Sequence, residues 1–289
     1  MSTRGVGYTK VLVETLRKGI YEQPVPNIDF LYEQSSTKST EFDLGDRVQL
    51  PDGRAFRYCK AGSTMSSMKY GVYSYNQLVA EYSSVTCVPT AAIAIGDKSA
   101  AFTVTAASIG VSRDGVIAKD ELKGGYISFY GSTSGHRPQR GIVGNSALAS
   151  DGTSITIYWD AAMDKAMDAG VATEILANPY SDVRSDTEAY GIWCSCIGMP
   201  NVLAVSGNYY WVQTWGIFRI TPTGVALGAN QGERQMVMAA NGSVCSLPTW
   251  HTQIATTPTH SYQIAGPIVE RTSGTSTDAA PFINLTFNP

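Results

Sequence analysis

The chain is poor in charged residues. Of its 289 residues only 16% are Asp, Glu, Lys or Arg, whereas soluble domains average roughly 25%. Uncharged polar side chains and the 16 tyrosines must therefore cover much of the surface, which is less typical of solitary cytosolic enzymes than of β-proteins and proteins buried in assemblies. The formal net charge of -3 lacks the clustered basic excess of nucleic-acid-binding proteins, so we expect no nucleic-acid partner.

Long apolar runs are absent as well. No stretch approaches the roughly 18 apolar residues that a membrane-spanning helix needs. Residues 1–8 contain no apolar segment of the kind found in a signal peptide. We therefore expect a soluble protein that is made in a cytoplasm and has no membrane partner.

Residues suited to metal binding are few and poorly spaced. The three histidines are His136, His251 and His260, and the five cysteines are Cys59, Cys87, Cys194, Cys196 and Cys245. An odd cysteine count without a secretion signal argues against a disulfide framework. Cys194 and Cys196 would share one face of a strand, but two further soft ligands at matching spacing are lacking. We expect buried free thiols, no metal site and no cofactor.

Motifs of catalysis are also missing. The chain has no P-loop and no G-x-G-x-x-G. The triplet at residues 144–146 is not a hydrolase nucleophile elbow, because Leu148 stands where a second glycine is needed. The acids Asp160, Asp164 and Asp168 are four residues apart and are interpreted as a solvated stripe. We expect no catalytic residues and a non-enzymatic protein.

From Phe42 onward the chain consists of short β-like runs separated by glycine-containing turns. The clearest runs, rich in β-branched and aromatic residues, are 101–105, 125–130, 154–159 and 209–220. Their spacing predicts a mainly β fold, with sandwich or barrel-like domains and short helices. The main helical candidate is residues 161–169, of one or two turns. The lack of longer helical periodicity disfavours an α/β enzyme fold.

Residues 1–40 differ from the rest. Residues 11–13 could start one amphipathic turn, but Pro24 and Pro26 follow, and then the polar run 33–40. Such a segment cannot bury itself on its own domain. We expect an extended N-terminal arm over residues 1–40 that contacts neighbouring subunits. The β-rich body then spans residues 41–289, with a possible sub-boundary near 90–100.

The most informative stretch is residues 44–62, which predicts a β-hairpin. Strands over 47–50 and 54–60 flank a turn at 51–53, where Gly53 supplies the positive φ that tight turns need. Basic residues decorate this hairpin and the Gly/Ser-rich loop around His136. The candidate interface residues are Arg47, Arg54, Arg57, Lys60, Arg137 and Arg140. A solvated face, or contacts within the residues' own domain, is the alternative interpretation.

The densest aromatic feature lies at residues 208–219. On a strand, Tyr209, Trp211 and Trp215 share one face, while Tyr210 and Val212 share the other. Stacked aromatics of this kind suit a sugar-binding platform. They equally suit a core strand, which we favour because both faces carry large side chains.

Taken in order, several motifs resemble a group of tailed-phage virion proteins, found mostly in environmental phages and described as head decoration or capsid structural proteins. These motifs are residues 44–62, Gly124-Gly-Tyr126, Ala177-Asn-Pro-Tyr180, Tyr209–Gly216 and Pro281–Leu285. The resemblance covers residues 42–289 and lies in motif order rather than in an active-site signature.

This resemblance implies a bacteriophage virion structural protein of the decoration type that coats or cements the capsid and is assembled in the host cytoplasm. Its expected partners are other copies of itself and other phage head proteins, within a homo-oligomeric lattice. The alternatives are a major capsid protein, which should contain a long spine helix, and a tail or fibre glycan-binding module, which should expose the aromatic strand.

Overall fold

The structure is a computed structural model of the whole chain. It describes residues 10–15, 19–24, 28–65, 67–74, 87–104, 116–130, 137–149, 152–185, 195–222, 234–239, 242–247, 263–270 and 281–287. All three histidines and Cys194 lie outside these residues, so the expectations for them remain predictions.

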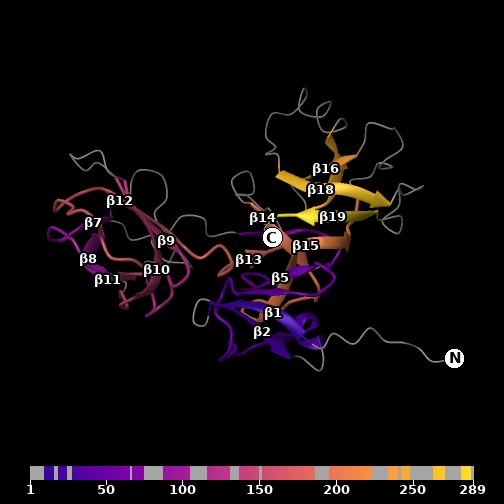
Figure 1. The fold of residues 1–289 in the computed structure, drawn as a ribbon, viewed down its shortest axis with the longest axis horizontal. Helices are drawn as coiled ribbons and strands as arrows, with labels where there is room; N and C mark the ends of the chain where they lie inside the picture. The colour runs from indigo at the N-terminus through magenta and orange to yellow at the C-terminus, as the bar shows by residue number, and fades with distance from the viewer. Residues whose placement is uncertain are drawn as a thin grey trace. The chain divides into compact units, whose positions relative to one another are not determined.

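The chain divides into two compact units (Figure 1). The first unit combines Met1–Tyr75 with Asp182–Pro289, and the second is Asn76–Ser181. The second unit is thus inserted into the first. The second unit begins at Asn76 and ends at Ser181, whereas the sequence suggested boundaries at residue 41 and near residues 90–100. The difference arises because the N-terminal and C-terminal thirds of the chain share one sheet, which their spacing in the sequence does not indicate.

The first unit is built on an antiparallel sheet of 13 strands. Its main path runs β17-β16-β18-β19-β15-β5-β4-β1-β2, and β3, β6, β13 and β14 pair beside that path. The strands are β1 (Lys10–Thr15), β2 (Gly19–Pro24), β3 (Gln34–Ser35), β4 (Arg47–Gln49), β5 (Ala55–Lys60), β6 (Val72–Ser74), β13 (Val183–Arg184), β14 (Cys196–Pro200), β15 (Tyr209–Arg219), β16 (Gln235–Met238), β17 (Val244–Ser246), β18 (Gln263–Glu270) and β19 (Phe282–Thr286). The one helix that lies wholly within the described residues is the 3-10 helix η1 (Asp29–Tyr32), and Leu247 is also helical.

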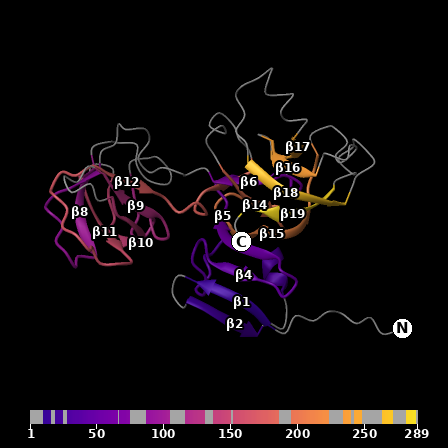
Figure 2. The same ribbon diagram turned by 45° about the horizontal axis from the view of Figure 1, so that its top comes forward.

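The N-terminal segment is part of this sheet. Residues 11–13 form strand and not the helical turn that their sequence suggested, because β1 pairs with β2 on one side and with β4 on the other. Val13 lies opposite Val48 and is fully buried. Figure 2 shows β1 and β2 continuing the sheet beyond β4. Over residues 10–15 and 19–24 the expected arm is therefore a strand pair of the first unit, while its contact with neighbouring subunits remains a prediction.

The second unit is a closed barrel of six strands in the order β10-β11-β8-β7-β12-β9. These strands are β7 (Cys87–Pro89), β8 (Ser99–Val104), β9 (Tyr126–Phe129), β10 (Gln139–Asn145), β11 (Ser154–Trp159) and β12 (Thr173–Leu176). Alternation places Ile155, Ile157 and Trp159 inside the barrel. Closure removes the open sheet edges that otherwise invite aggregation.

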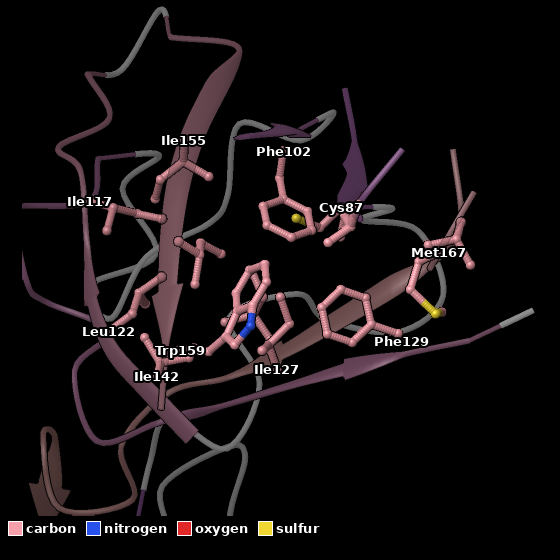
Figure 3. Close-up of a cluster of buried hydrophobic side chains, with 14 of the residues drawn as sticks. Cys87, Phe102, Ile117, Leu122, Ile127, Phe129, Ile142, Ile155, Trp159 and Met167 are labelled. Atoms are coloured by element: carbon pink, nitrogen blue, oxygen red, sulfur yellow. The ribbon is translucent and has the colours of Figure 1, made fainter. Parts of the chain in front are cut away.

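The barrel has its own hydrophobic core (Figure 3). Trp159 packs edge-on against Phe129, with ring centroids 5.8 Å apart, and against Phe102 at 6.5 Å. The indole Nε1 of Trp159 donates a hydrogen bond to the Asp97 carbonyl oxygen at 3.1 Å. The most polar atom of this large side chain is therefore satisfied, and the ring can be fully buried.

Residues 161–169 are not helical, which corrects the sequence-based expectation. Met163 N–H donates to the Asp97 carbonyl, and Met167 exchanges two hydrogen bonds with Ile93. These contacts with residues 93–97 replace the bonds that a helix would make within itself. Both methionines are buried in the barrel core, so their spacing reflects two side chains entering one core from an irregular segment.

The mainly β fold predicted from the sequence is confirmed. The runs at 101–105, 125–130, 154–159 and 209–220 correspond to β8, β9, β11 and β15. Among the described residues, no helix has the length and apolar character required to span a membrane.

Because the barrel closes on itself and encloses a separate core, we expect residues 76–181 to fold without the rest of the chain. The isolated fragment should unfold in one cooperative transition on chemical denaturation, monitored by far-UV circular dichroism. Trp159→Ala should lower its free energy of unfolding by about 3–5 kcal/mol through lost burial and a residual cavity. A fragment without a cooperative transition would show that the barrel depends on the first unit.

Candidate functional site

The charged hairpin forms as the sequence predicts. Arg47 lies opposite Arg57, and Val48 lies opposite Phe56. The turn closes through hydrogen bonds from Leu50 N–H to the Arg54 carbonyl at 2.8 Å and from Gly53 N–H to the Leu50 carbonyl at 3.0 Å. Gly53 has φ +90°, a conformation that costs glycine little and other residues more.

Arg54 is held by the hairpin itself. Its Nε donates to Asp52 Oδ2 at 2.8 Å, and a terminal nitrogen donates to the Tyr32 hydroxyl at 3.0 Å. The guanidinium also lies 5.9 Å from the centre of the Phe56 ring. These contacts join the turn to η1, so Arg54 already has a role within its own subunit.

Arg47 and Arg57 lie on the sheet face opposite to Phe56 and Tyr58, and both are half-buried. Arg57 donates from a terminal nitrogen to the Gly45 carbonyl at 2.9 Å. Arg47 donates to Gln49 Oε1 at 3.1 Å. Arg57 therefore ties β5 to the residues that precede β4 and is not a freely solvated charge.

The remaining basic candidates also make contacts within their own unit. Lys60 Nζ lies 5.8 Å from the centre of the Tyr209 ring. Arg137 is exposed, with its guanidinium 5.9 Å from the centre of the Tyr130 ring. Arg140 donates to the carbonyl oxygens of Ala161 and Ala162 and to Asp164 Oδ1, at 3.1–3.2 Å. The candidate interface residues thus fall into two groups. Arg47, Arg54, Arg57 and Lys60 belong to the first unit, and Arg137 and Arg140 belong to the second.

The aromatic strand is buried where it would have to be exposed to bind a sugar. Trp211 is 3% exposed. Its ring packs against Phe42 with centroids 5.0 Å apart, against Tyr58 at 5.1 Å and against Phe30 at 5.8 Å. We call this group of four rings the aromatic cluster. It confirms the core interpretation for this part of β15.

The described thiols are free and buried. Burial raises the pKa of Cys87 and Cys245 to about 11 and that of Cys196 to about 12. Burial likewise raises the pKa of Cys59 well above its ordinary value. Since the thiolate is the nucleophile and the metal ligand, these sulfurs are inert near neutral pH. The described part of the chain also contains no cluster of His, Cys, Asp and Glu able to hold a metal ion.

An exposed apolar surface lies on the other face of the C-terminal part of the sheet. Phe218, Ala265, Ile268 and Ile283 belong to the core of this unit, so their immediate neighbours along each strand face outward. We call this surface the outer face; its exposed apolar residues are Ile217, Ile264, Val269 and Phe282, with exposed fractions of 45%, 56%, 58% and 38%.

The outer face was not identified from the sequence. Phe282 and Ile283 alternate between solvent and core, but the five residues of β19 are too few to fix from sequence which side is buried. A bulge in β18 adds to the difficulty, because Val269 falls between the partners of Ile283 and Phe282. The period-2 pattern is therefore interrupted where it is needed.

Searches of protein-family models, of curated proteins and of solved structures find no match to this chain.

The contacts of the two hairpin arginines predict different effects of substitution on stability. Arg57→Ala should lower the free energy of unfolding by about 1–3 kcal/mol, because a half-buried carbonyl loses a charged donor. Arg54→Ala, which removes a more exposed ion pair, should cost about 0–1 kcal/mol. Urea denaturation of both variants measures the difference. Equal, negligible losses would mean that Arg57 is a solvated charge.

Proposed function

We propose that this chain is a non-enzymatic structural protein of a bacteriophage virion, of the decoration type, that coats or cements the capsid. It acts through contacts with other copies of itself and with other head proteins. The observation that carries the proposal is the outer face, an exposed apolar surface on the C-terminal part of the sheet. Surfaces of this kind mark interaction sites in proteins that are otherwise polar outside.

Several features of the chain support an assembly role. The motif order at residues 42–289 resembles virion proteins. The surface is poor in charge, which lowers the desolvation cost when broad surfaces are buried between subunits. Arg54, Arg57 and Arg140 stabilise turns and loops of their own units, which suits a rigid building block.

The two alternatives predict features that bear on the choice. A major capsid protein of tailed phages should contain a long spine helix, and no long helix lies within the described residues, where the one complete helix is the four-residue η1. A glycan-binding module built on the aromatic strand should expose Trp211, which is buried. The decoration role is therefore the one we propose.

The copy number per particle tests this function. Quantitative mass spectrometry of density-purified particles of the encoding phage should find the chain in numbers comparable to the major capsid protein. A few copies per particle would favour a tail or fibre role, and absence from the particle would contradict a virion role.

A matched pair of substitutions ties the result to the outer face. Phe282→Asp should reduce incorporation into particles, because it places a charge in the apolar contact. Ile95→Asp should leave incorporation unchanged, since Ile95 is 68% exposed and belongs to the barrel unit, which contributes no residue to the outer face. Equal incorporation of both variants would contradict the assignment of the outer face.

A further inference from the structure

The two ends of the large sheet differ. At one end, β17 is covered, since Val244 N–H donates to the Thr221 carbonyl at 3.0 Å and Pro222 forms a parallel bridge with Val244. At the other end, β2 pairs only with β1 among the described residues. Ile20 in β2 has 66% of its surface exposed. Among the described residues, β2 is thus an edge strand whose outer backbone groups have no strand partner.

The register of the hairpin indicates which residues of β2 face outward. In an antiparallel pair, opposite residues either exchange two hydrogen bonds or exchange none. Pro24 lies opposite Lys10 and has no N–H, so it fits a position without exchange. By alternation, the backbone N–H and C=O groups of Ile20 and Glu22 then point away from β1. These groups form a short ladder of two donors and two acceptors.

We propose that β2 pairs antiparallel with β2 of a second copy of this chain and so joins the two sheets into one. The inference deepens the proposed function, since it assigns one of the subunit contacts on which that function rests. A second copy is the occupant that fits, because two-fold symmetry satisfies both identical ladders at once.

Symmetry also selects the register. An axis at Tyr21 places Ile20 of each copy opposite Glu22 of the other, and the two pairs exchange four hydrogen bonds. An axis at Glu22 would place two carboxylates opposite each other, which is unfavourable. It would also pair Ile20 with Pro24, which cannot donate. An axis at Ile20 would place Glu22 opposite position 18, which lies outside β2, so only two hydrogen bonds would form within the strand. The register centred on Tyr21 is therefore the one we assign.

Sedimentation velocity of the purified chain tests the pairing. The wild type should associate as concentration rises. Glu22→Pro removes one outward donor per copy and leaves the bonds between β1 and β2 intact, so it should weaken association at least about tenfold. Glu22→Gln, which keeps the donor, should associate like the wild type. A wild type that stays monomeric, or a Glu22→Pro variant that associates equally well, would overturn the proposal.

Crosslinking tests the register without a substitution that could unfold the hairpin. At the two-fold axis, opposite residues without exchanged bonds bring their Cα atoms to about 4.5 Å, within disulfide range. Tyr21→Cys should therefore give a crosslinked dimer under mild oxidation, whereas Gly19→Cys and the wild type should not. Equal crosslinking of the two cysteine variants would overturn the assigned register.

These measurements use the isolated protein, so they separate the inference from the proposed function. A chain that pairs through β2 but is absent from virions would sustain the edge contact and contradict the virion role. A chain that is abundant in virions but does not pair through β2 would support the virion role and contradict the edge contact.

Discussion

Packing around Trp211 is the interaction on which the first unit depends. Strand β15 is the longest strand at 11 residues and pairs with β3, β5, β14 and β19. The aromatic cluster covers one face of β15 with Phe30 and Phe42, which come from the N-terminal segment. Buried aromatic rings contribute a large share of the free energy that stabilises a protein core. This packing fixes the path of residues 28–44 and thereby the start of β4.

The packing around Trp211 also determines the position of the strand pair β1–β2. Val13 joins the same buried group as Leu31, Val48 and Trp211. Strands β1 and β2 therefore extend a sheet whose position is already fixed by the aromatic cluster. The same packing fixes the position of the outer edge of β2. A segment rich in polar residues can in this way belong to the sheet without a core of its own.

The sequence predicted the local structure well and the long-range pairing poorly. The Asp52-Gly53 turn between two alternating runs was enough to predict the hairpin, because turn conformation depends on neighbouring residues in the sequence. Burial of Trp211 was also predictable, since large side chains occupy both faces of β15. The inserted barrel was not, because its boundaries depend on which strands pair across more than 100 residues. The helix predicted for residues 161–169 was wrong for a related reason. Hydrogen bonds to residues 93–97 outweigh the helical tendency of this short segment.

The candidate site was predicted only in part. The charged residues were located, but their partners were not, because a basic residue on a hairpin is equally consistent with solvent, a neighbouring subunit and its own turn. Arg54 and Arg140 contact residues 22 and 24 positions away, beyond the reach of pattern reasoning. Neither the outer face nor the open edge has a sequence motif, since both arise from the arrangement of strands in the folded sheet.

Hydrogen exchange in a Trp211→Ala variant tests the central role of the aromatic cluster most directly. Removing this ring should cost about 3–5 kcal/mol, and the loss should be confined to the first unit. We predict faster exchange of backbone amides in residues 28–44 and in β4 and β5, with unchanged protection in the barrel strands, which serve as an internal control. Unchanged protection in residues 28–44, or an equal loss in both units, would contradict the account.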